Sequence, residues 1–230
     1  CYNYGGNMTY GSVAYNSVLS LTMSHNWYVS AVFRSAAPSV GSLYYSYYNG
    51  QEIWYEWSKS TLSKSDNAGS LASIIIDYSG VIQTISSTAF RNHTYLTEII
   101  LPNCSYIGSY AFQSCYSLTS INLSNCLSVD SCGFDDCSSL TSVNLPNCSY
   151  IGRYAFATCL SLTSIDLPNC TYISREAFYA CHSLTSISLP LCEYVGFEAF
   201  AHCHSLPSIN LPNCSYVNSD VFYDCSALRT

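Results

Sequence analysis

Residues 145–166 read LPNCSYIGRYAFATCLSLTSID, and this 22-residue pattern recurs along most of the chain. Residues 79–100 fit the same frame with weaker matches, and residues 71–76 read as one earlier strand. A strict period of this length is the sequence signature of a solenoid, in which each unit packs only against its neighbours. The clearest units are residues 101–122, 123–144, 145–166, 167–188, 189–210 and the incomplete 211–230.

Each unit contains one short strand and a turn region. The run LTSIDL at 162–167 is short, and its apolar Ile165 and Leu167 alternate with a polar residue, which favours a strand. Pro168 then ends the ladder pairing. The other half of the unit carries an Ile, an Ala-Phe pair and a Cys too closely spaced for a full helix. We therefore predict one short parallel β-strand per 22-residue repeat, with turns or 3₁₀ segments on the convex side.

The pattern IGxxAFxxCxSLTSIxLP resembles the BspA-like class of leucine-rich repeats. Residues 151–159 and 161–165 carry it without a mismatch, and the resemblance covers roughly residues 71–230. This chain departs from the class in its period, which is commonly about 23 residues there, and in a second cysteine after Pro-Asn. The resemblance implies a leucine-rich repeat solenoid and adhesion to host proteins or to other cells.

Most of the 14 cysteines form two series with the 22-residue period, offset by 11 residues. Equivalent Cβ atoms of stacked units lie about 5 Å apart, whereas a relaxed disulfide requires about 3.8 Å. Free, buried thiols are therefore favoured over disulfides, and the absence of a CxxC pair argues against zinc. Cys132 lies outside both series and is expected near the surface. The series are Cys104, Cys126, Cys148, Cys170, Cys192, Cys214 and Cys115, Cys137, Cys159, Cys181, Cys203, Cys225.

The composition excludes several classes of function. Only 9% of the residues are charged and the net charge is −7, so the chain lacks the basic surface that nucleic acids and anionic membranes require. No apolar run approaches the roughly 18 residues of a membrane-spanning helix. No Ser-His-Asp order, phosphate loop or HExxH motif is present. We therefore expect no enzyme, no catalytic residues and no cofactor.

Three histidines form a possible exception. His182 and His204 occupy the same position in neighbouring units, and His202 lies two residues before His204. Stacked histidines beside carboxylates could hold a divalent cation, but solvated residues on the convex side are the favoured interpretation. We therefore expect no metal site. The candidate carboxylates are Glu176, Glu198 and Asp220.

Two sets of repeated side chains are candidate binding residues. One set follows the concave sheet and offers neutral hydroxyl and amide groups, joined by one carboxylate: Thr119, Thr141, Thr163, Thr185, Asn122, Asn144 and Asp166. The other set is a stripe of tyrosines along one edge, interrupted by Ser128: Tyr106, Tyr150, Tyr172, Tyr194 and Tyr216. Tyrosines are common in binding surfaces. Solubility of the sheet and self-stacking of the rings explain the same pattern without a ligand.

Residues 1–68 lack the period and contain all three tryptophans. Asn49-Gly50 predicts a hairpin across residues 43–57, residues 27–34 read as another strand, and residues 59–69 read as a polar linker. We assign residues 1–68 to a small aromatic-rich β domain or N-terminal cap and residues 69–230 to the repeat array. A chain beginning at Cys1 is typical of an acylated lipoprotein, but a simple sequence boundary is the favoured explanation.

Together these features predict a non-catalytic binding or adhesion module on a microbial or viral surface, at an extracellular or cell-surface location. Its expected partner is a protein or glycan of a host or neighbouring cell, and self-association is possible. The alternative is a structural subunit that assembles into a filament or coat.

Overall fold

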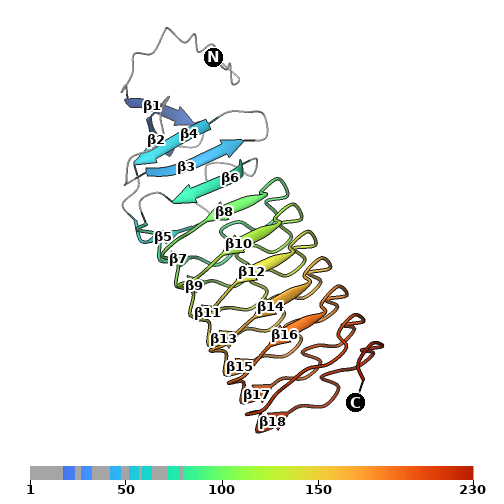
Figure 1. The fold of residues 1–230 in the computed structure, drawn as a ribbon. Helices are drawn as coiled ribbons and strands as arrows, with labels where there is room; N and C mark the ends of the chain where they lie inside the picture. Colours follow the sequence, from blue (N-terminus) through green and yellow to red (C-terminus); the bar gives the residue numbers. More distant parts are fainter. Residues whose placement is uncertain are drawn as a thin grey trace.

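The computed structural model describes residues 18–23, 27–32, 42–47, 52–56, 59–63, 72–77 and 80–229. These residues form a solenoid of stacked repeats with antiparallel strands at one end (Figure 1). All regular elements among them are β-strands. The described part of the chain accordingly contains no helix that is long and apolar enough to cross a membrane.

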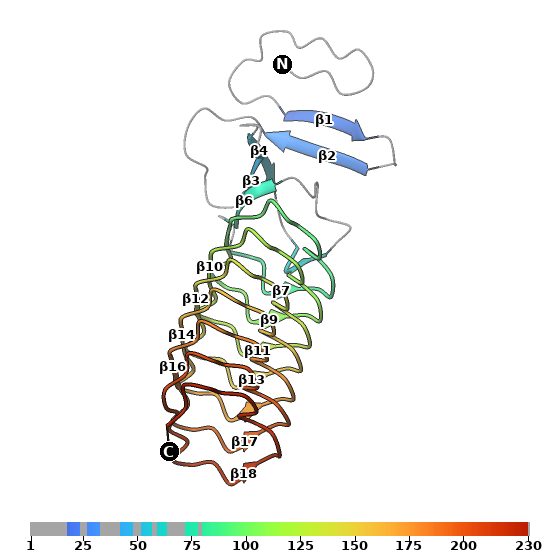
Figure 2. The same ribbon diagram turned by 90° about the vertical axis from the view of Figure 1, so that its right-hand side faces the viewer.

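Two sheets extend along the solenoid (Figures 1 and 2). Sheet A contains β1 Val18–Met23, β2 Trp27–Val32, β3 Ser42–Tyr47, β4 Glu52–Glu56, β6 Ala72–Asp77, β8 Glu98–Ile100, β10 Ser120–Asn122, β12 Ser142–Asn144, β14 Ser164–Asp166 and β16 Ser186–Ser188. Sheet B contains β5 Thr61–Leu62, β7 Thr84–Ile85, β9 Tyr106–Ile107, β11 Ser128–Val129, β13 Tyr150–Ile151, β15 Tyr172–Ile173, β17 Tyr194–Val195 and β18 Tyr216–Val217.

The strand order follows the repeat. Among the described residues, sheet A has ten strands in the order β1-β2-β4-β3-β6-β8-β10-β12-β14-β16, and sheet B has eight in the order β18-β17-β15-β13-β11-β9-β7-β5. From β6 onward the strands of sheet A pair in parallel, and β10 meets β12 with Ser120 opposite Ser142. The predicted leucine-rich repeat solenoid is confirmed. The two-residue strand that each repeat adds to sheet B was not predicted, because two residues are too few to show an alternating pattern.

The third side of each repeat consists of hydrogen-bonded turns. The backbone N–H of Phe112 donates to the carbonyl oxygen of Gly133 in the next repeat at 2.8 Å. Two residues in each of these turn regions adopt a left-handed conformation, for example Tyr154 with φ 56° and Thr158 with φ 54°. Left-handed residues interrupt a right-handed helix, which explains why this side stays a series of turns. Neighbouring repeats are therefore joined by main-chain hydrogen bonds on all three sides.

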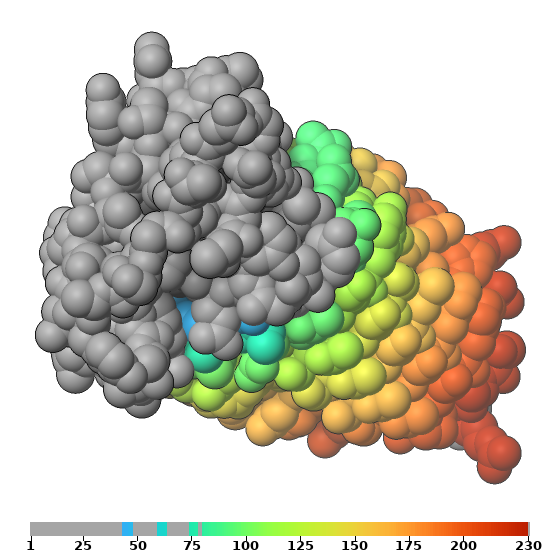
Figure 3. All heavy atoms as spheres, turned by 90° about the horizontal axis from the view of Figure 1, so that it is seen from above, coloured from blue at the N-terminus to red at the C-terminus, as the bar shows by residue number. Residues whose placement is uncertain are grey.

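A column of phenylalanine rings occupies the core. The rings of Phe112 and Phe134 stack with centroids 5.0 Å apart and planes 1° apart, and those of Phe156 and Phe178 with centroids 5.4 Å apart. These side chains are fully buried. Burying one such side chain stabilises a fold by about 1.5–3 kcal/mol, so the column is a main source of cohesion between repeats. Figure 3 shows the repeats as successive colour bands, from green to red along the sequence.

The prediction of free, buried cysteines is confirmed for ten residues of the two series, and Cys214 and Cys225 of the last repeat are partly exposed. Burial, opposed by hydrogen bonds to backbone groups, raises the pKa of Cys104 to about 11 and that of Cys115 to about 12. The expectation that Cys132 lies near the surface is wrong. The residue is only 8% exposed, because it is short and the equivalent residues of the neighbouring repeats, Tyr110 and Tyr154, are longer.

The N-terminal strands continue sheet A. β3 pairs with β4 in antiparallel register, with Leu43 opposite Tyr55, as the hairpin prediction requires. The Asn49-Gly50 turn lies outside the described residues, as does Cys1. β6 pairs antiparallel with β3 and parallel with β8, so the two strand arrangements share one sheet. The assignment of residues 1–68 to a separate domain or cap stays a prediction.

The linker prediction for residues 59–69 is wrong at β5. Its two residues pair in parallel with β7 and begin sheet B. Leu62 is fully buried in the core, which supplies the apolar contact that a free linker would lack. The sequence sign of this strand was a single leucine among polar residues, and one apolar residue cannot show a periodic pattern.

Candidate binding surface

The outer face of sheet A presents repeated polar side chains. In β10, Ser120 and Asn122 are exposed on either side of Ile121, which is 4% exposed. The same alternation holds in β12 and β14. The residues of β10, β12, β14 and β16 together line a shallow groove of about 520 Å³. The groove brings three predicted residues together, namely Asn122, Asn144 and Asp166.

The predicted threonines are exposed beside this groove but bond to the neighbouring repeat. The hydroxyl of Thr141 donates to the carbonyl oxygen of Thr119 at 2.9 Å, and that of Thr185 donates to the carbonyl oxygen of Thr163 at 3.0 Å. Each hydroxyl keeps its lone pairs for a partner, because a hydroxyl has one donor and two acceptor sites. The threonine row therefore has a structural role in addition to any binding role.

The asparagine side chains of the groove also hydrogen-bond to the neighbouring repeat. Asn144 donates from Nδ2 to Oδ1 of Asn122 at 2.9 Å, which aligns the two amides along the groove. Asp166 follows in the same row, opposite Asn144 in the sheet register. A partner at this surface would therefore meet aligned amide and carboxylate groups at the spacing of the strands, which is about 4.8 Å.

Four of the five predicted tyrosines form a continuous stack. The ring centroids are 5.5 Å apart between Tyr150 and Tyr172, 4.4 Å between Tyr172 and Tyr194, and 5.1 Å between Tyr194 and Tyr216. Tyr150 and Tyr172 remain 37% exposed. Because neighbouring rings cover each other's faces, the stack exposes ring edges and hydroxyl groups. A partner would therefore contact ring edges and hydroxyl groups along most of the stripe.

Tyr106 stands apart from this stack, because Ser128 occupies the intervening position. Its hydroxyl donates to Oδ2 of Asp130 at 3.0 Å, and Ser109 donates to the same oxygen at 2.7 Å. Partial burial, followed by the hydrogen bond to Asp130, raises the pKa of Tyr106. The sequence identified the interruption at Ser128, but it contained no sign of this hydrogen-bonded group.

Sequence reasoning missed a hollow of about 600 Å³ on the turn side. Cys132 contributes to its lining, together with Tyr110 and Tyr154 of the two flanking repeats. The guanidinium of Arg153 lies over the Tyr154 ring, 4.8 Å from its centroid. The sequence signal for this hollow was Cys132, a short residue at a position where the neighbouring repeats have Tyr110 and Tyr154.

A buried carboxylate lies beside this hollow. Glu176 is 5% exposed, and its Oε2 lies 3.1 Å from Nε of Arg175 and 3.5 Å from Nε of Arg153. Burial by itself raises the pKa of Glu176. Hydrogen bonds from Tyr154 and Arg175 and the charges of the two arginines outweigh burial and lower it. This arrangement pairs Glu176 with arginines and keeps it away from the histidines.

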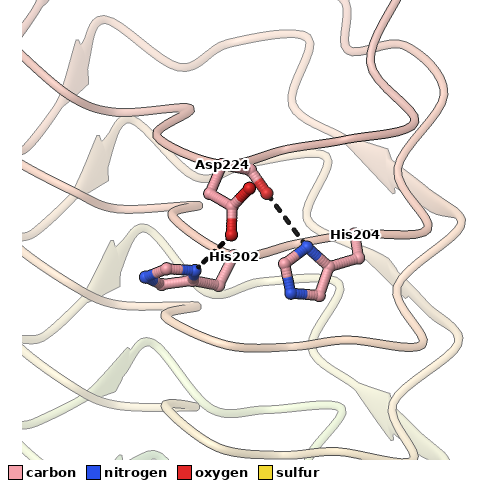
Figure 4. Close-up of side chains that lie close together, drawn as sticks. All are labelled: His202, His204 and Asp224. Carbon is pink, nitrogen blue, oxygen red and sulfur yellow. Dashed lines mark hydrogen bonds and ion pairs between the residues drawn. The ribbon is translucent and has the colours of Figure 1, made fainter.

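The histidines meet a different carboxylate from those that the sequence suggested. His202 Nδ1 lies 3.0 Å from Oδ2 of Asp224, and His204 Nδ1 lies 3.0 Å from the backbone oxygen of Asp224 (Figure 4). Among the described residues, this is the one group in which three histidine, cysteine or acidic side chains bring potential metal-ligand atoms together. Glu176, Glu198 and Asp220 are not part of it.

The fold and the repeated polar face define a leucine-rich repeat solenoid. The family model of the BspA type leucine-rich repeat region matches residues 66–185 and 105–229, with six copies of the repeat. The chain belongs to this family. No curated protein matches it.

Solved structures of bacterial leucine-rich proteins share the fold. A leucine-rich cell surface protein from Faecalibacterium prausnitzii is 23% identical with a TM-score of 0.61, and the match covers 86% of this chain and 54% of that one. A leucine-rich repeat protein from Eubacterium ventriosum is 18% identical with a TM-score of 0.56, covering 81% of this chain and 51% of that one. This chain thus spans about half the length of either protein.

Proposed function

We propose that this chain is a non-catalytic binding or adhesion module presented on the surface of a microbial cell or a virus particle. Its partner is a protein or glycan of a host or neighbouring cell. Membership of the BspA type family supports a surface role by analogy. The Faecalibacterium structure is described as a cell surface protein, and this gives the proposed location the same kind of support.

The groove on sheet A is the observation that carries the proposal. It is lined by four successive strands that each contribute a serine and a second polar side chain, asparagine in two strands, aspartate in one and serine in one, so a repetitive partner can make a similar contact several times. A single contact of this kind is worth about 1 kcal/mol, and several in register add to a useful affinity. With only 9% charged residues in the chain, such binding should depend little on ionic strength.

The test measures binding of the full chain to a neutral glycan array and to immobilised extracellular-matrix proteins, at low and high salt. One variant replaces Asn122, Asn144 and Asp166 with alanine, and a second replaces Tyr150, Tyr172 and Tyr194 with serine. Serine is chosen because Ser128 occupies the equivalent position. Tyr116→Ser serves as the control, since Tyr116 is exposed and lies in neither the groove nor the stripe.

Loss of binding in either triple variant, with an unchanged melting curve and an unaffected control, supports the proposed surface. Intact binding in both variants would place the contact elsewhere. Loss of folding in the tyrosine variant would give the stripe a structural role. The groove variant alone would then show whether the groove on sheet A carries the binding. Binding that disappears at high salt would contradict a neutral contact.

The alternative function is self-assembly into a filament or coat through the repeated faces. Light scattering on the purified chain separates the two proposals. A mass that stays constant over a wide range of protein concentration supports the binding module, whereas polymers that grow with concentration support assembly.

A further inference from the structure

The histidines near the end of the array occupy two positions of the repeat. Residues at one such position in successive repeats lie in a row along the solenoid. His202 and Asp224 are equivalent residues of consecutive repeats, and both adopt a left-handed conformation, with φ 61° and 54°. His182 and His204 are equivalent residues of the row two positions later, and their rings stack with centroids 4.9 Å apart. The earlier residues of the first row contain no histidine: Asn92, Ser114, Asp136, Thr158 and Ala180.

The rows bring two imidazoles to one aspartate residue. Oδ2 of Asp224 accepts a hydrogen bond from Nδ1 of His202 at 3.0 Å, and the backbone oxygen of Asp224 accepts one from Nδ1 of His204 at 3.0 Å. One potential ligand atom from each of the three side chains lies within 4.8 Å of the other two (Figure 4). The group is accessible from solvent, since the Asp224 side chain is 53% exposed.

The surroundings fix the position of His202. The rings of Tyr179 and Tyr223 pack against it edge-on, with centroids 5.1 Å and 5.4 Å away. The ring of His204 lies 5.8 Å from it in a similar perpendicular arrangement. A side chain held in this way loses little conformational freedom when it binds a ligand, and this favours affinity.

We propose that His202, His204 and Asp224 bind a divalent transition-metal ion of the zinc type. Imidazole nitrogen and carboxylate oxygen suit Zn²⁺, whereas Ca²⁺ and Mg²⁺ prefer sites made of oxygen atoms. The ligand atoms of a tetrahedral zinc site lie about 3.3 Å apart, so small side-chain rotations close the site. The ion replaces the two hydrogen bonds, and each imidazole carries its proton on Nε2.

The remaining coordination position is open to water or to a group on a partner. The nearby cysteines do not supply it, because their thiols are directed to the core: Cys203 donates to the carbonyl oxygen of Phe178 and Cys225 to that of Phe200. The three ligands come from residues 189–210 and 211–229, so the ion joins two successive repeats. Binding of the folded form alone should therefore raise the melting temperature.

The experiment titrates the full chain, free of any polyhistidine tag, with Zn²⁺ alone in a calorimeter. We expect one ion per chain. His202→Asn removes one ligand while keeping the residue type that Asn92 shows in the same left-handed position, and His204→Thr reproduces Thr94. Asp224→Asn removes the carboxylate. Each of these variants should bind zinc at least about tenfold more weakly.

His182→Thr is the matched control, because His182 stacks on His204 but lies outside the ligand group. It should change zinc affinity less than about threefold, well short of the tenfold effect expected for a ligand. Co²⁺ provides a second readout that does not depend on affinity. A tetrahedral cobalt spectrum without a thiolate charge-transfer band is expected.

Three results would overturn the proposal. Wild-type chain that takes up no zinc lacks the site, and a doubly substituted His202→Asn/His204→Thr chain that binds as well as wild type places the ion elsewhere. A thiolate band in the cobalt spectrum assigns the metal to cysteines. Thermal melts without metal verify that every variant is folded, so that a loss of binding reports on the ligands.

Discussion

The thiol of Cys159 donates a hydrogen bond to the backbone oxygen of Phe134, one repeat earlier in the chain, at 3.2 Å. The same oxygen accepts the backbone N–H of Cys137 at 3.2 Å. Both acceptor sites of a buried carbonyl are therefore occupied, and leaving such a group unsatisfied is costly. The contact explains the strict period of the series that contains Cys159, since cysteine is small, largely apolar and also a weak donor.

The first prediction concerns thiol reactivity. The thiolate is the reactive form, and burial raises the pKa of Cys148 and Cys192 to about 11 and that of Cys203 to about 12. Titration with a thiol reagent near neutral pH should therefore modify few groups in the native protein and the full set after denaturation. Cys214, which is partly exposed, should react early. Rapid modification of most cysteines without denaturant would contradict the burial of the two series.

The second prediction concerns the phenylalanine column. Phe156 is fully buried between Phe134 and Phe178, so Phe156→Ala should lower the free energy of unfolding by about 3–5 kcal/mol. Phe222 stacks on one ring and is only partly buried. Phe222→Ala should therefore cost clearly less. Denaturant titrations followed by circular dichroism give both values, and equal losses would show that stacking between repeats does not decide stability.

The third prediction concerns the interruption of the tyrosine stack. Ser128 lies opposite Tyr106 and Tyr150 in the register of sheet B. Ser128→Tyr inserts a ring between two existing rings, and we expect a gain of about 0.5–1.5 kcal/mol in the free energy of unfolding. Ser128→Ala is the control, because it adds no ring. A loss of stability in the tyrosine variant would indicate that the hydrogen bond from Tyr106 to Asp130 requires the space.

The fourth prediction concerns acid stability. The pKa of Glu176 is lower in the folded chain than its ordinary value of 4.5. Its contribution to stability is therefore present above the pKa of the unfolded chain and is lost as the pH falls through the folded value. Glu176→Gln should flatten the fall in melting temperature below about pH 4.5. A variant that follows the wild-type profile throughout would show that the arginine pairs contribute nothing measurable.

The solenoid could be predicted from the sequence because the same 22-residue pattern recurs along the chain. A single LTSI run is ambiguous, but the recurrence of Leu162 and Ile165 at equivalent positions leaves few architectures. The stripe of tyrosines could also be predicted, since Tyr172 and Tyr194 occupy the same position. Repetition determines which side chains become neighbours, and those are the features that the sequence predicts well.

Features that depend on contacts between different positions could not be predicted. Thr61 and Leu62 join sheet B through a pairing with β7 that no local pattern encodes. Cys132 is buried because longer residues surround it, which depends on side-chain length in the neighbouring repeats. Asp224 is a different case, because it lies at the position of His202 one repeat later, so the period already contained this neighbour although the candidate carboxylates were sought elsewhere. The contact of its backbone oxygen with His204 joins two different positions of the repeat, and no pattern in the sequence encodes it.

The in-register pairing of neighbouring repeats also has a consequence for how such a chain changes length. Removing or duplicating a block of 22 residues leaves the cysteine, phenylalanine and tyrosine rows aligned, whereas adding one residue to a strand turns every later side chain of that strand to the opposite face. The length of the solenoid can therefore change only in steps of one whole repeat. Each additional unit extends the molecule by about 4.8 Å and supplies one more copy of every surface group.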